Sequence, residues 1–315
     1  MKELKIDFSD FWPGFIKDNN YFFNLLSLKY NVTIDNNPDV LFFSSYGDSY
    51  LNYKCSRIFY SAENERADFS ACDLALTFDH VYNNRHFRLP LYVLHIDRAN
   101  NLSELTSELS KEKALEVWNS KKKFCCMVVS NGNAKERIHF FNDISSFRQV
   151  DSGGRFMNNV GGPVKDKLEF IKDYKFVISY ENSVYSGYTT EKILEPYFVN
   201  SIPIYWGNPE INKDFNPSTF INASQFNTNA EVLDLMTQIE NDCELAISYL
   251  CPPKIEDVSE KNYFQKDKVL SFIEKGIGLK HPVASSVFLS FKHQAKRKCR
   301  SIEFYFIKYT VGHFR

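Results

Sequence analysis

The segment KFVISYENSVYSGYTTEKILEPYFVNSIPIYWG, residues 175–207, carries the pattern that decides the fold. Two apolar runs, KFVISY (175–180) and SIPIYWG (201–207), are typical of buried strands, and TTEKILEPYF between them has the composition of a helix. A strand, a helix and a strand in one short stretch predict a βαβ unit with parallel strands. The polar residues after the first strand then lie at the carboxyl end of the sheet, where α/β proteins bind their ligands.

Further apolar runs of the same kind occur on both sides of this unit. Predicted strands are LKIDF (4–8), DVLFFSS (39–45), RIFYSAEN (57–64), DLALTFDH (73–80) and FCCMVVS (124–130), and predicted helices are 21–30, AKERIHFFNDISSF (134–147) and LEFIKDY (168–174). The charged stretch 101–123 predicts a helical bridge between two halves. The alternation of strands and helices predicts an α/β fold with mostly parallel sheets, divided into domains at 1–120 and 121–285 with a tail at 286–315.

Composition limits the class of protein. The formal net charge of -1 excludes a general polyanion binder but permits a local basic patch. The seven cysteines contain no C-x-x-C pair, which argues against a zinc site or a disulfide framework and for reduced thiols. No apolar stretch is long enough to span a membrane, and MKELKIDFSDFW lacks the apolar core of a signal peptide, so we expect a soluble, cytoplasmic chain. Residues 289–315 are basic and then aromatic, which favours either peripheral contact with an anionic membrane or a helix packed on the core.

The residues that begin the helix between the two strands indicate an anion site. We expect this helix to begin near Thr189 or Thr190, where unpaired backbone N–H groups carry a partial positive charge. Lys192 in its first turn adds a cation where helices ordinarily favour an anion. Glu191 can accept hydrogen bonds from hydroxyl groups, and Asn182 can both donate and accept. The alternative is structural, with Thr190 and Glu191 capping the helix and Lys192 in a surface ion pair.

A second cation occurs at the corresponding point of another strand–helix pair. Arg137 falls in the first turn of the helix that follows FCCMVVSNGN (124–133). Two helix N-termini, one with Arg137 and one with Lys192, are suited to bind a diphosphate together. The sequence has no D-x-D motif and its seven histidines are dispersed. We therefore expect charge neutralisation by Arg and Lys, with no required metal or other cofactor.

Taken together, SYENSVYSGYTTEKILEPYFVNSIPIYWG (179–207) resembles the signature of the α-1,3-fucosyltransferases, the inverting GT-B glycosyltransferases of family 10. Its features are an aromatic–Glu–Asn–Ser, then Tyr-x-Thr-Glu-Lys, an amphipathic helix and a Pro-containing strand ending in Gly. Weaker supporting stretches lie at 59–79, 128–141, 150–164 and 213–222, and the variant resembles bacterial members that modify lipopolysaccharide. Two features depart from the pattern. Pro196 lies inside the predicted helix, where it should remove one backbone hydrogen bond, and residues 1–50 contain no matching motif.

The resemblance implies two Rossmann-like domains that face each other across a cleft, the first for the acceptor and the second for GDP-fucose. It implies that Arg137 and Lys192 bind the pyrophosphate. Further donor contacts are implied for Val128, Ser130, Asn182, Tyr188 and Glu191. Glu191 would hold ribose or fucose hydroxyls and lie near the positive charge of the transition state. Glu63, in SAEN, matches the proposed general base, and Glu65 is its rival two residues later.

The implied reaction transfers L-fucose from GDP-fucose to O3 or O4 of N-acetylglucosamine or glucose in N-acetyllactosamine- or lactose-type glycans. The bacterial variant implies Lewis-type lipopolysaccharide as the acceptor and the inner face of the bacterial inner membrane as the place of action. Two alternatives stay open. A related transferase for another nucleotide sugar would prefer UDP or ADP to GDP. A non-catalytic module for a glycan or a nucleotide would bind GDP without transferring fucose.

Overall fold

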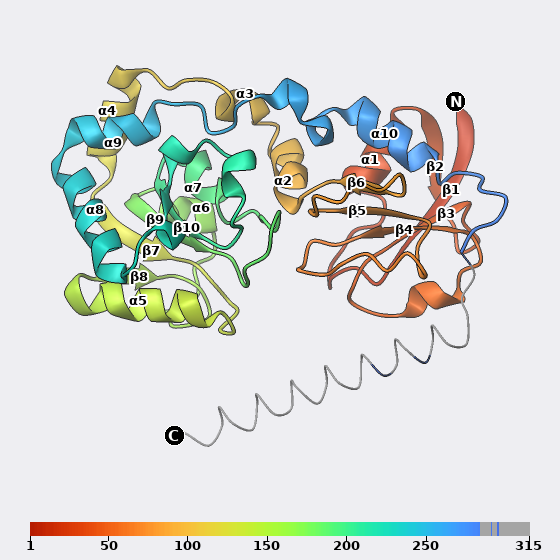
Figure 1. The fold of residues 1–315 in the computed structure, drawn as a ribbon, viewed down its shortest axis with the longest axis horizontal. Helices are drawn as coiled ribbons and strands as arrows, with labels where there is room; N and C mark the ends of the chain where they lie inside the picture. The colour runs from red at the N-terminus through yellow and green to blue at the C-terminus, as the bar shows by residue number, and fades with distance from the viewer. Residues whose placement is uncertain (284–290, 292–294, 296–315) are drawn as a thin grey trace. The chain divides into compact units, whose positions relative to one another are not determined.

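A computed structural model describes residues 1–283, 291 and 295 of the chain, so the predicted tail lies outside the described residues except at these two last positions (Figure 1). The chain divides into two compact units. The first contains Met1–Thr77, Val81–Phe87 and the described residues from Lys266 on, and the second contains Phe78–His80 and Arg88–Gln265. The last crossing from the first unit to the second lies between Phe87 and Arg88, and the chain returns to the first unit at Lys266. The sequence instead predicts a boundary at residue 120 and a second domain that continues to residue 285.

The first unit contains a six-stranded sheet with the strand order β2-β1-β3-β4-β5-β6. Its strands are β1 (Lys2–Ser9), β2 (Tyr30–Ile34), β3 (Val40–Phe43), β4 (Ser56–Tyr60), β5 (Leu74–Thr77) and β6 (His86–Arg88). Its helices are α1 (Tyr21–Ser27), the 3₁₀ turn η1 (Ser49–Asn52) and α10 (Lys266–Glu274). The pairs from β2 to β5 are parallel, as the alternation of strands and helices predicts.

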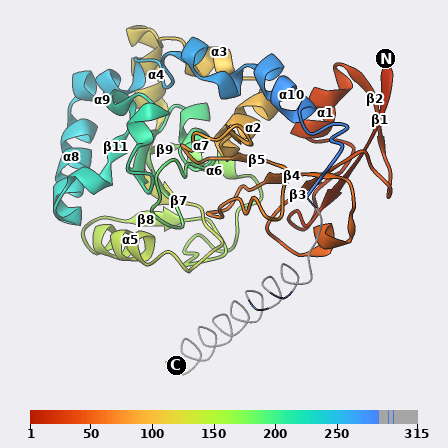
Figure 2. The same cartoon turned by 45° about the vertical axis from the view of Figure 1, so that its right-hand side comes forward.

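Both faces of the first sheet are buried by aromatic side chains. On one face, the ring of Phe22 in α1 stacks on Phe42 with centroids 5.0 Å apart. On the other face, Phe43 stacks on Tyr50 of η1 at 4.1 Å. Helix α10 belongs to this unit because Glu274 accepts a hydrogen bond from the Tyr30 hydroxyl, and it lies beside α1 in Figures 1 and 2. The N-terminal unit is thus completed by residues from the far end of the described chain.

The second unit contains a five-stranded, fully parallel sheet with the order β11-β10-β9-β7-β8. Its strands are β7 (Lys123–Met127), β8 (Val150–Ser152), β9 (Tyr174–Tyr180), β10 (Ile202–Trp206) and β11 (Ile221–Asn222). Its α-helices are α2 (Leu91–Ala99), α3 (Leu102–Leu105), α4 (Lys111–Ser120), α5 (Lys135–Phe147), α6 (Lys167–Ile171), α7 (Leu194–Phe198), α8 (Asn229–Asn241) and α9 (Cys243–Leu250). Its 3₁₀ turns are η2 (Ile211–Lys213), η3 (Pro217–Thr219), η4 (Ala223–Gln225), η5 (Val258–Glu260) and η6 (Asn262–Phe264).

Successive side chains of β7 and β9 point to opposite faces of this sheet and into two different cores. Cys125, Phe176 and Ile178 pack with residues of α4, α5, α8 and α9. Cys126 and Val177 pack with residues of and beside α6, including Ile171. The sheet is therefore covered on both sides, as parallel sheets require. The carboxyl ends of β7 and β9 lie next to each other because these strands pair directly.

The predicted helix between β9 and β10 begins later than the sequence indicates. Helix α7 starts at Leu194, and residues 191–193 form a turn, so the prediction that it begins at Thr189 or Thr190 is wrong. Lys192 therefore precedes the helix and does not lie in its first turn. Pro196 is the third residue of α7, where a backbone N–H has no acceptor within the helix, so the proline removes no helical hydrogen bond.

Two short strands escape the sequence patterns. Only Leu28 and Lys29 separate strand β2 from α1. The side chains of β2 are half-buried or exposed, so its sequence does not stand out from that of the predicted helix 21–30. Strand β6 has three residues. Within the described ranges no helix has the length and apolar character needed to cross a membrane. The cysteines of these ranges, Cys55, Cys72, Cys125, Cys126, Cys243 and Cys251, are all free thiols.

Candidate functional site

A pocket of about 350 Å³ lies in the second unit, where β7 and β9 end. It is lined by Val128, Val129, Ser130, Asn131, Arg137, Lys167, Val177, Ile178, Asn182, Glu191, Lys192 and Glu195. Four of these residues directly follow β7, and Asn182 follows β9. The pocket thus occupies the position that a parallel α/β sheet offers to a ligand, at the carboxyl ends of adjacent strands.

Arg137, the third residue of α5, is a buried cation at this pocket. Its Nη1 donates to the Tyr180 carbonyl and to Oδ1 of Asn182, both at 3.1 Å, and its Nη2 donates to the Asn131 carbonyl at 2.7 Å. No carboxylate of the described residues lies within 4 Å of the guanidinium. Burial lowers the pKa of Arg137, against the opposing effect of Glu181. The guanidinium nevertheless stays charged, and a buried charge without an opposite partner is costly until an anion binds beside it.

Lys192 is the second cation of the pocket, and acidic groups hold it. Its Nζ lies 3.1 Å from Oε2 of Glu181 and 3.9 Å from Oε1 of Glu191. Burial lowers the pKa of Lys192, but the charges of these two glutamates outweigh burial and raise the pKa above its ordinary value of 10.5. The alternative interpretation of Lys192, as a member of an ion pair, therefore holds in part. These ion pairs are largely buried, however, and Lys192 still lines the pocket.

Glu191 and Glu195 bring negative charge to the same pocket. Burial alone would raise the pKa of Glu191, but the charges of Lys192 and His95 lower it, so this carboxylate is ionised at neutral pH. Glu195 forms an ion pair with Lys167, and burial raises the pKa of its carboxyl group. An ionised carboxylate such as Glu191 accepts hydrogen bonds from ligand hydroxyl groups. Cations for an anion and an acceptor for hydroxyls thus lie in one pocket.

The structure brings six of the predicted donor residues together. Val128, Ser130, Arg137, Asn182, Glu191 and Lys192 all line the pocket. Tyr188 does not line it: the side chain is buried and its ring packs edge-to-face on Phe78, with centroids 5.0 Å apart. A donor contact by Tyr188 stays a prediction.

Glu63 and Glu65 lie in the first unit, in the segment after β4. Oε1 of Glu63 accepts a hydrogen bond from the Tyr46 hydroxyl at 2.7 Å. The backbone N–H of Glu65 donates to the Glu63 carbonyl at 2.6 Å, and both side chains are half-buried. The base role of either glutamate stays a prediction.

Sequence reasoning missed several residues of the site. These are Val129, Asn131, Lys167, Val177, Ile178 and Glu195, which line the pocket, and Glu181, which lies behind Lys192. Only Glu181 had a signal, because it is the glutamate of the aromatic–Glu–Asn–Ser pattern. Lys167 and Glu195 come from two short helices that are distant in sequence, so their pairing depends on the tertiary fold.

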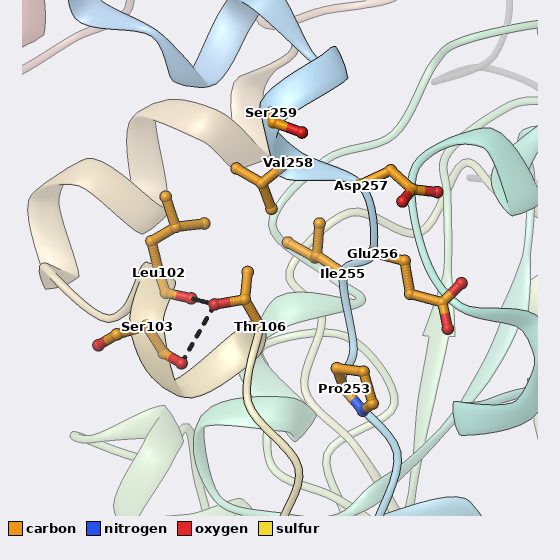
Figure 3. A pocket seen from close by; sticks show the side chains of 9 residues that line it. All are labelled: Leu102, Ser103, Thr106, Pro253, Ile255, Glu256, Asp257, Val258 and Ser259. Carbon is orange, nitrogen blue, oxygen red and sulfur yellow. Dashed lines mark hydrogen bonds between the residues drawn. The ribbon is translucent and has the colours of Figure 1, made fainter.

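A second pocket of about 730 Å³ lies between α3 and the segment that contains η5 (Figure 3). It is lined by Leu102, Ser103, Thr106, Pro253, Ile255, Glu256, Asp257, Val258 and Ser259. The Thr106 hydroxyl donates back to carbonyls of α3, at 3.0 Å to Leu102 and 3.2 Å to Ser103. The lining has two acidic side chains and no basic one, so this pocket does not suit a diphosphate. No group of three His, Cys, Asp or Glu side chains in the described part of the chain is arranged to hold a metal ion.

Two family models match the chain. Residues 6–95 match the alpha-(1,3)-fucosyltransferase FucT N-terminal domain. Residues 118–271 match the C-terminal region of glycosyltransferase family 10 (fucosyltransferase). The second match contains every residue of the 350 Å³ pocket, and the first contains Glu63 and Glu65.

Curated relatives carry related names. An alpha-(1,3)-fucosyltransferase FucT of Helicobacter pylori is 33% identical over 314 aligned residues, which cover 86% of this chain and 65% of the relative. A 4-galactosyl-N-acetylglucosaminide 3-alpha-L-fucosyltransferase 9 of Mus musculus is 30% identical over 135 residues, 41% of this chain and 37% of the relative. The chain therefore spans less than two thirds of the length of these relatives.

Solved structures resemble most of the chain. A crystal structure of an α1,3-fucosyltransferase with GDP-fucose has a TM-score of 0.74 and 29% identity, and the match covers 90% of this chain and 93% of that one. A structure of an α1,3-fucosyltransferase with GDP gives the same values. Two parallel sheets, a pocket with two cations at the strand ends of the second sheet, and matches to both family models lead to one conclusion: the chain belongs to glycosyltransferase family 10, the fucosyltransferases.

Proposed function

We propose that this chain is an inverting fucosyltransferase that transfers L-fucose from GDP-fucose to O3 or O4 of N-acetylglucosamine or glucose in N-acetyllactosamine-type glycans. Family membership supports fucosyl transfer. The related crystal structures with GDP-fucose and GDP support the donor. The names of the H. pylori and mouse relatives support an α-1,3 linkage and an N-acetylglucosamine acceptor. Lewis-type lipopolysaccharide is the proposed natural acceptor.

The observation that carries the proposal is the state of Arg137. Its guanidinium is buried at the pocket, bonded to one amide oxygen and two carbonyls, and has no carboxylate partner among the described residues. A diphosphate supplies the missing negative charge. Lys192, also at this pocket, can share it. The apolar side chains of Val128 and Val129 offer a surface for the base, and Glu191 accepts hydrogen bonds from ribose or fucose hydroxyls.

The proposed reaction is a single displacement. The acceptor hydroxyl oxygen forms a bond to C1 of fucose while the bond from C1 to the β-phosphate oxygen breaks. A β-linked donor then yields an α-fucoside. The leaving GDP gains negative charge on its β-phosphate, which Arg137 and Lys192 stabilise. Negative charge on Glu191 stabilises the positive charge that develops at the fucosyl centre.

Glu63 is the proposed general base, which accepts the proton that the acceptor hydroxyl loses. Oε1 of Glu63 accepts the hydrogen bond from Tyr46. Its other carboxylate oxygen, Oε2, can accept the proton of the acceptor hydroxyl. The acceptor is accordingly assigned to the first unit. Glu65 is the competing choice, because it lies two residues away in the same segment. Arg and Lys neutralise the diphosphate in this proposal, so no metal ion or other cofactor is required.

A donor and acceptor screen tests the proposal. The protein is incubated with GDP-fucose, or with UDP- and ADP-sugars, and with N-acetyllactosamine or lactose, and the linkage of the product is determined. We expect an α-fucoside at O3 or O4 from GDP-fucose alone. Transfer from a UDP- or ADP-sugar, or GDP binding without any transfer, would contradict the proposal.

Peripheral attachment to the inner face of the bacterial inner membrane is a further part of the proposal. It is supported by the basic and aromatic composition of residues 289–315. Sedimentation of the full chain with anionic and neutral vesicles tests it. We expect binding to the anionic vesicles that weakens with added salt.

A further inference from the structure

Glu181, the first residue after β9, is a fully buried carboxylate and is not among the residues that line the 350 Å³ pocket. Its Oε1 accepts hydrogen bonds from the backbone N–H of Thr190 at 2.7 Å and from the Thr190 hydroxyl at 3.0 Å. Its Oε2 accepts from the same hydroxyl at 2.7 Å and from Nζ of Lys192 at 3.1 Å. Both carboxylate oxygens are therefore satisfied by the turn that leads into α7.

Thr190 links the carboxylate to the ammonium group. A threonine hydroxyl has one proton to donate and two lone pairs to accept with. The Thr190 hydroxyl gives its proton to Glu181 and accepts from Nζ of Lys192 at 2.9 Å. An ammonium group has three protons, so two of those on Lys192 are used by Glu181 and Thr190, and one is left. Since Lys192 lines the 350 Å³ pocket, the remaining proton is available to a ligand oxygen there.

We propose that Glu181 is a positioning residue for the donor: together with Thr190 it fixes the Lys192 ammonium at the pocket so that one N–H is directed to a phosphate oxygen. The ligand part of this inference rests on the proposed function, whereas the positioning part concerns the free protein. Glu181 itself touches no substrate. The same network explains why Thr190 does not cap α7, since its hydroxyl and its N–H are both engaged by Glu181.

Glu181 and Lys192 act on each other's charge. Burial raises the pKa of Glu181, and the Lys192 ammonium and the hydrogen bonds from Thr190 oppose that rise. The ionised carboxylate in turn raises the pKa of Lys192. The charged or titratable groups around the ammonium include Glu181, Glu191, Glu195, Arg137 and His95. Burial and the positive charge of Arg137 lower the pKa of Lys192, and Glu181 and Glu191 raise it. Replacing Glu181 with glutamine removes one of the two opposing carboxylates while keeping the shape of the side chain. The ammonium of Lys192 should then lose its proton at lower pH than in the unchanged protein.

The first experiment measures Lys192 directly, without any ligand. The protein is labelled with ¹³Cε-lysine, and the Lys192 resonance is assigned by its loss in Lys192→Arg. Between neutral pH and about pH 10, we expect Lys192 to remain an ammonium in the unchanged protein and to titrate in Glu181→Gln. Glu169→Gln, which changes an exposed glutamate of α6, is the control and should leave Lys192 unaffected. Identical Lys192 titration in the unchanged protein and in Glu181→Gln would overturn the inference.

The second experiment measures binding of GDP and of inorganic pyrophosphate by calorimetry over the same pH range. We expect Kd to stay nearly constant in the unchanged protein and to rise at least about tenfold toward high pH in Glu181→Gln. Thr190→Val, which lacks the hydroxyl, should weaken both ligands at every pH, and Thr190→Ser should restore them. Equal Kd values for Thr190→Val and Thr190→Ser would overturn the positioning role. A preference of the unchanged protein for UDP would instead overturn the proposed function, and the titration of Lys192 would still decide the role of Glu181.

Discussion

A β-carbon on Gly207 would lie 2.6 Å from Cγ of Glu181 and 2.7 Å from its Cβ. Gly207 directly follows β10, and its φ of +151° lies in a region that residues with a side chain rarely adopt. The final glycine of the YWG sequence is therefore what allows the Glu181 side chain to fold back against Thr190 and Lys192. A substitution there acts on the Lys192 ammonium through Glu181.

Gly207→Ala should displace Glu181 and weaken GDP binding. Holding a residue with a side chain in a sparsely populated backbone region costs about 1–3 kcal/mol, and the contact with Glu181 adds to it. The matched control is Gly162→Ala, because Gly162 also has a positive φ, +135°, but has open space around the new methyl group. We expect both variants to lower Tm and only Gly207→Ala to weaken GDP binding, measured by calorimetry. Equal GDP affinity in the two variants would contradict the steric argument.

Arg137→Ala should weaken GDP binding by about 1.5–3 kcal/mol, the usual size of a charge-assisted hydrogen bond. Guanosine has no phosphate, so it should bind Arg137→Ala almost as well as it binds the unchanged protein. Arg155→Ala removes an exposed arginine of the same unit and serves as the control. The comparison is made with titrations of GDP and guanosine against all three proteins. If Arg137→Ala weakened guanosine binding as much as GDP binding, Arg137 would contact the guanosine part of the ligand and not its phosphates.

Glu63→Gln should nearly abolish fucose transfer and leave GDP affinity unchanged. Glutamine keeps the shape and the hydrogen bond with Tyr46 but cannot take up a proton. Product formation and the Kd of GDP are measured in parallel for Glu63→Gln and Glu65→Gln. Turnover retained in Glu63→Gln and lost in Glu65→Gln would assign the base to Glu65.

Transfer should continue in excess chelator, because Arg137 and Lys192 supply the positive charge that a metal ion would otherwise provide. The rate of fucose transfer is compared with and without the chelator, and again after added Mg²⁺ or Mn²⁺. Loss of activity that an added metal ion restores would show that the proposal omits a required cation.

The cysteines should differ strongly in their reactivity with a thiol reagent. Cys243 is exposed, whereas burial raises the pKa of Cys72 to about 12. Since the thiolate is the reactive form, Cys243 should be alkylated in the folded protein and Cys72 only after unfolding. Because the folded-state pKa lies above the ordinary thiol value of 9.0, this thiol favours folding below pH 9, and that contribution is lost as the pH rises toward 12. Site-resolved mass spectrometry measures the labelling, and rapid native labelling of Cys72 would contradict its burial.

Much of the sheet structure can be predicted from the sequence, because strands such as β1, β4, β7, β9 and β10 are apolar runs bounded by polar residues. The half-buried strand β2 lacks such a run, which is why it was missed. The sequence predicts each cation of the pocket in the first turn of a helix that follows a strand. The structure confirms this position for Arg137, whereas Lys192 lies in the turn before α7. The start of α7 was predicted wrongly because Thr190 has the chemistry of a helix cap. It uses that chemistry on Glu181, a tertiary partner that no local pattern reveals.

The return of α10 to the N-terminal unit has a consequence for how this protein can be divided. Glu274 forms an ion pair with Lys29 at 2.7 Å, and the ring of Phe272 lies 5.3 Å from that of Phe87. A fragment that stops after the first sheet would leave these aromatic and charged partners without their complement. A chimera that exchanges the N-terminal halves of two family members should therefore transplant residues 266–274 together with residues 1–87, as one discontinuous building block.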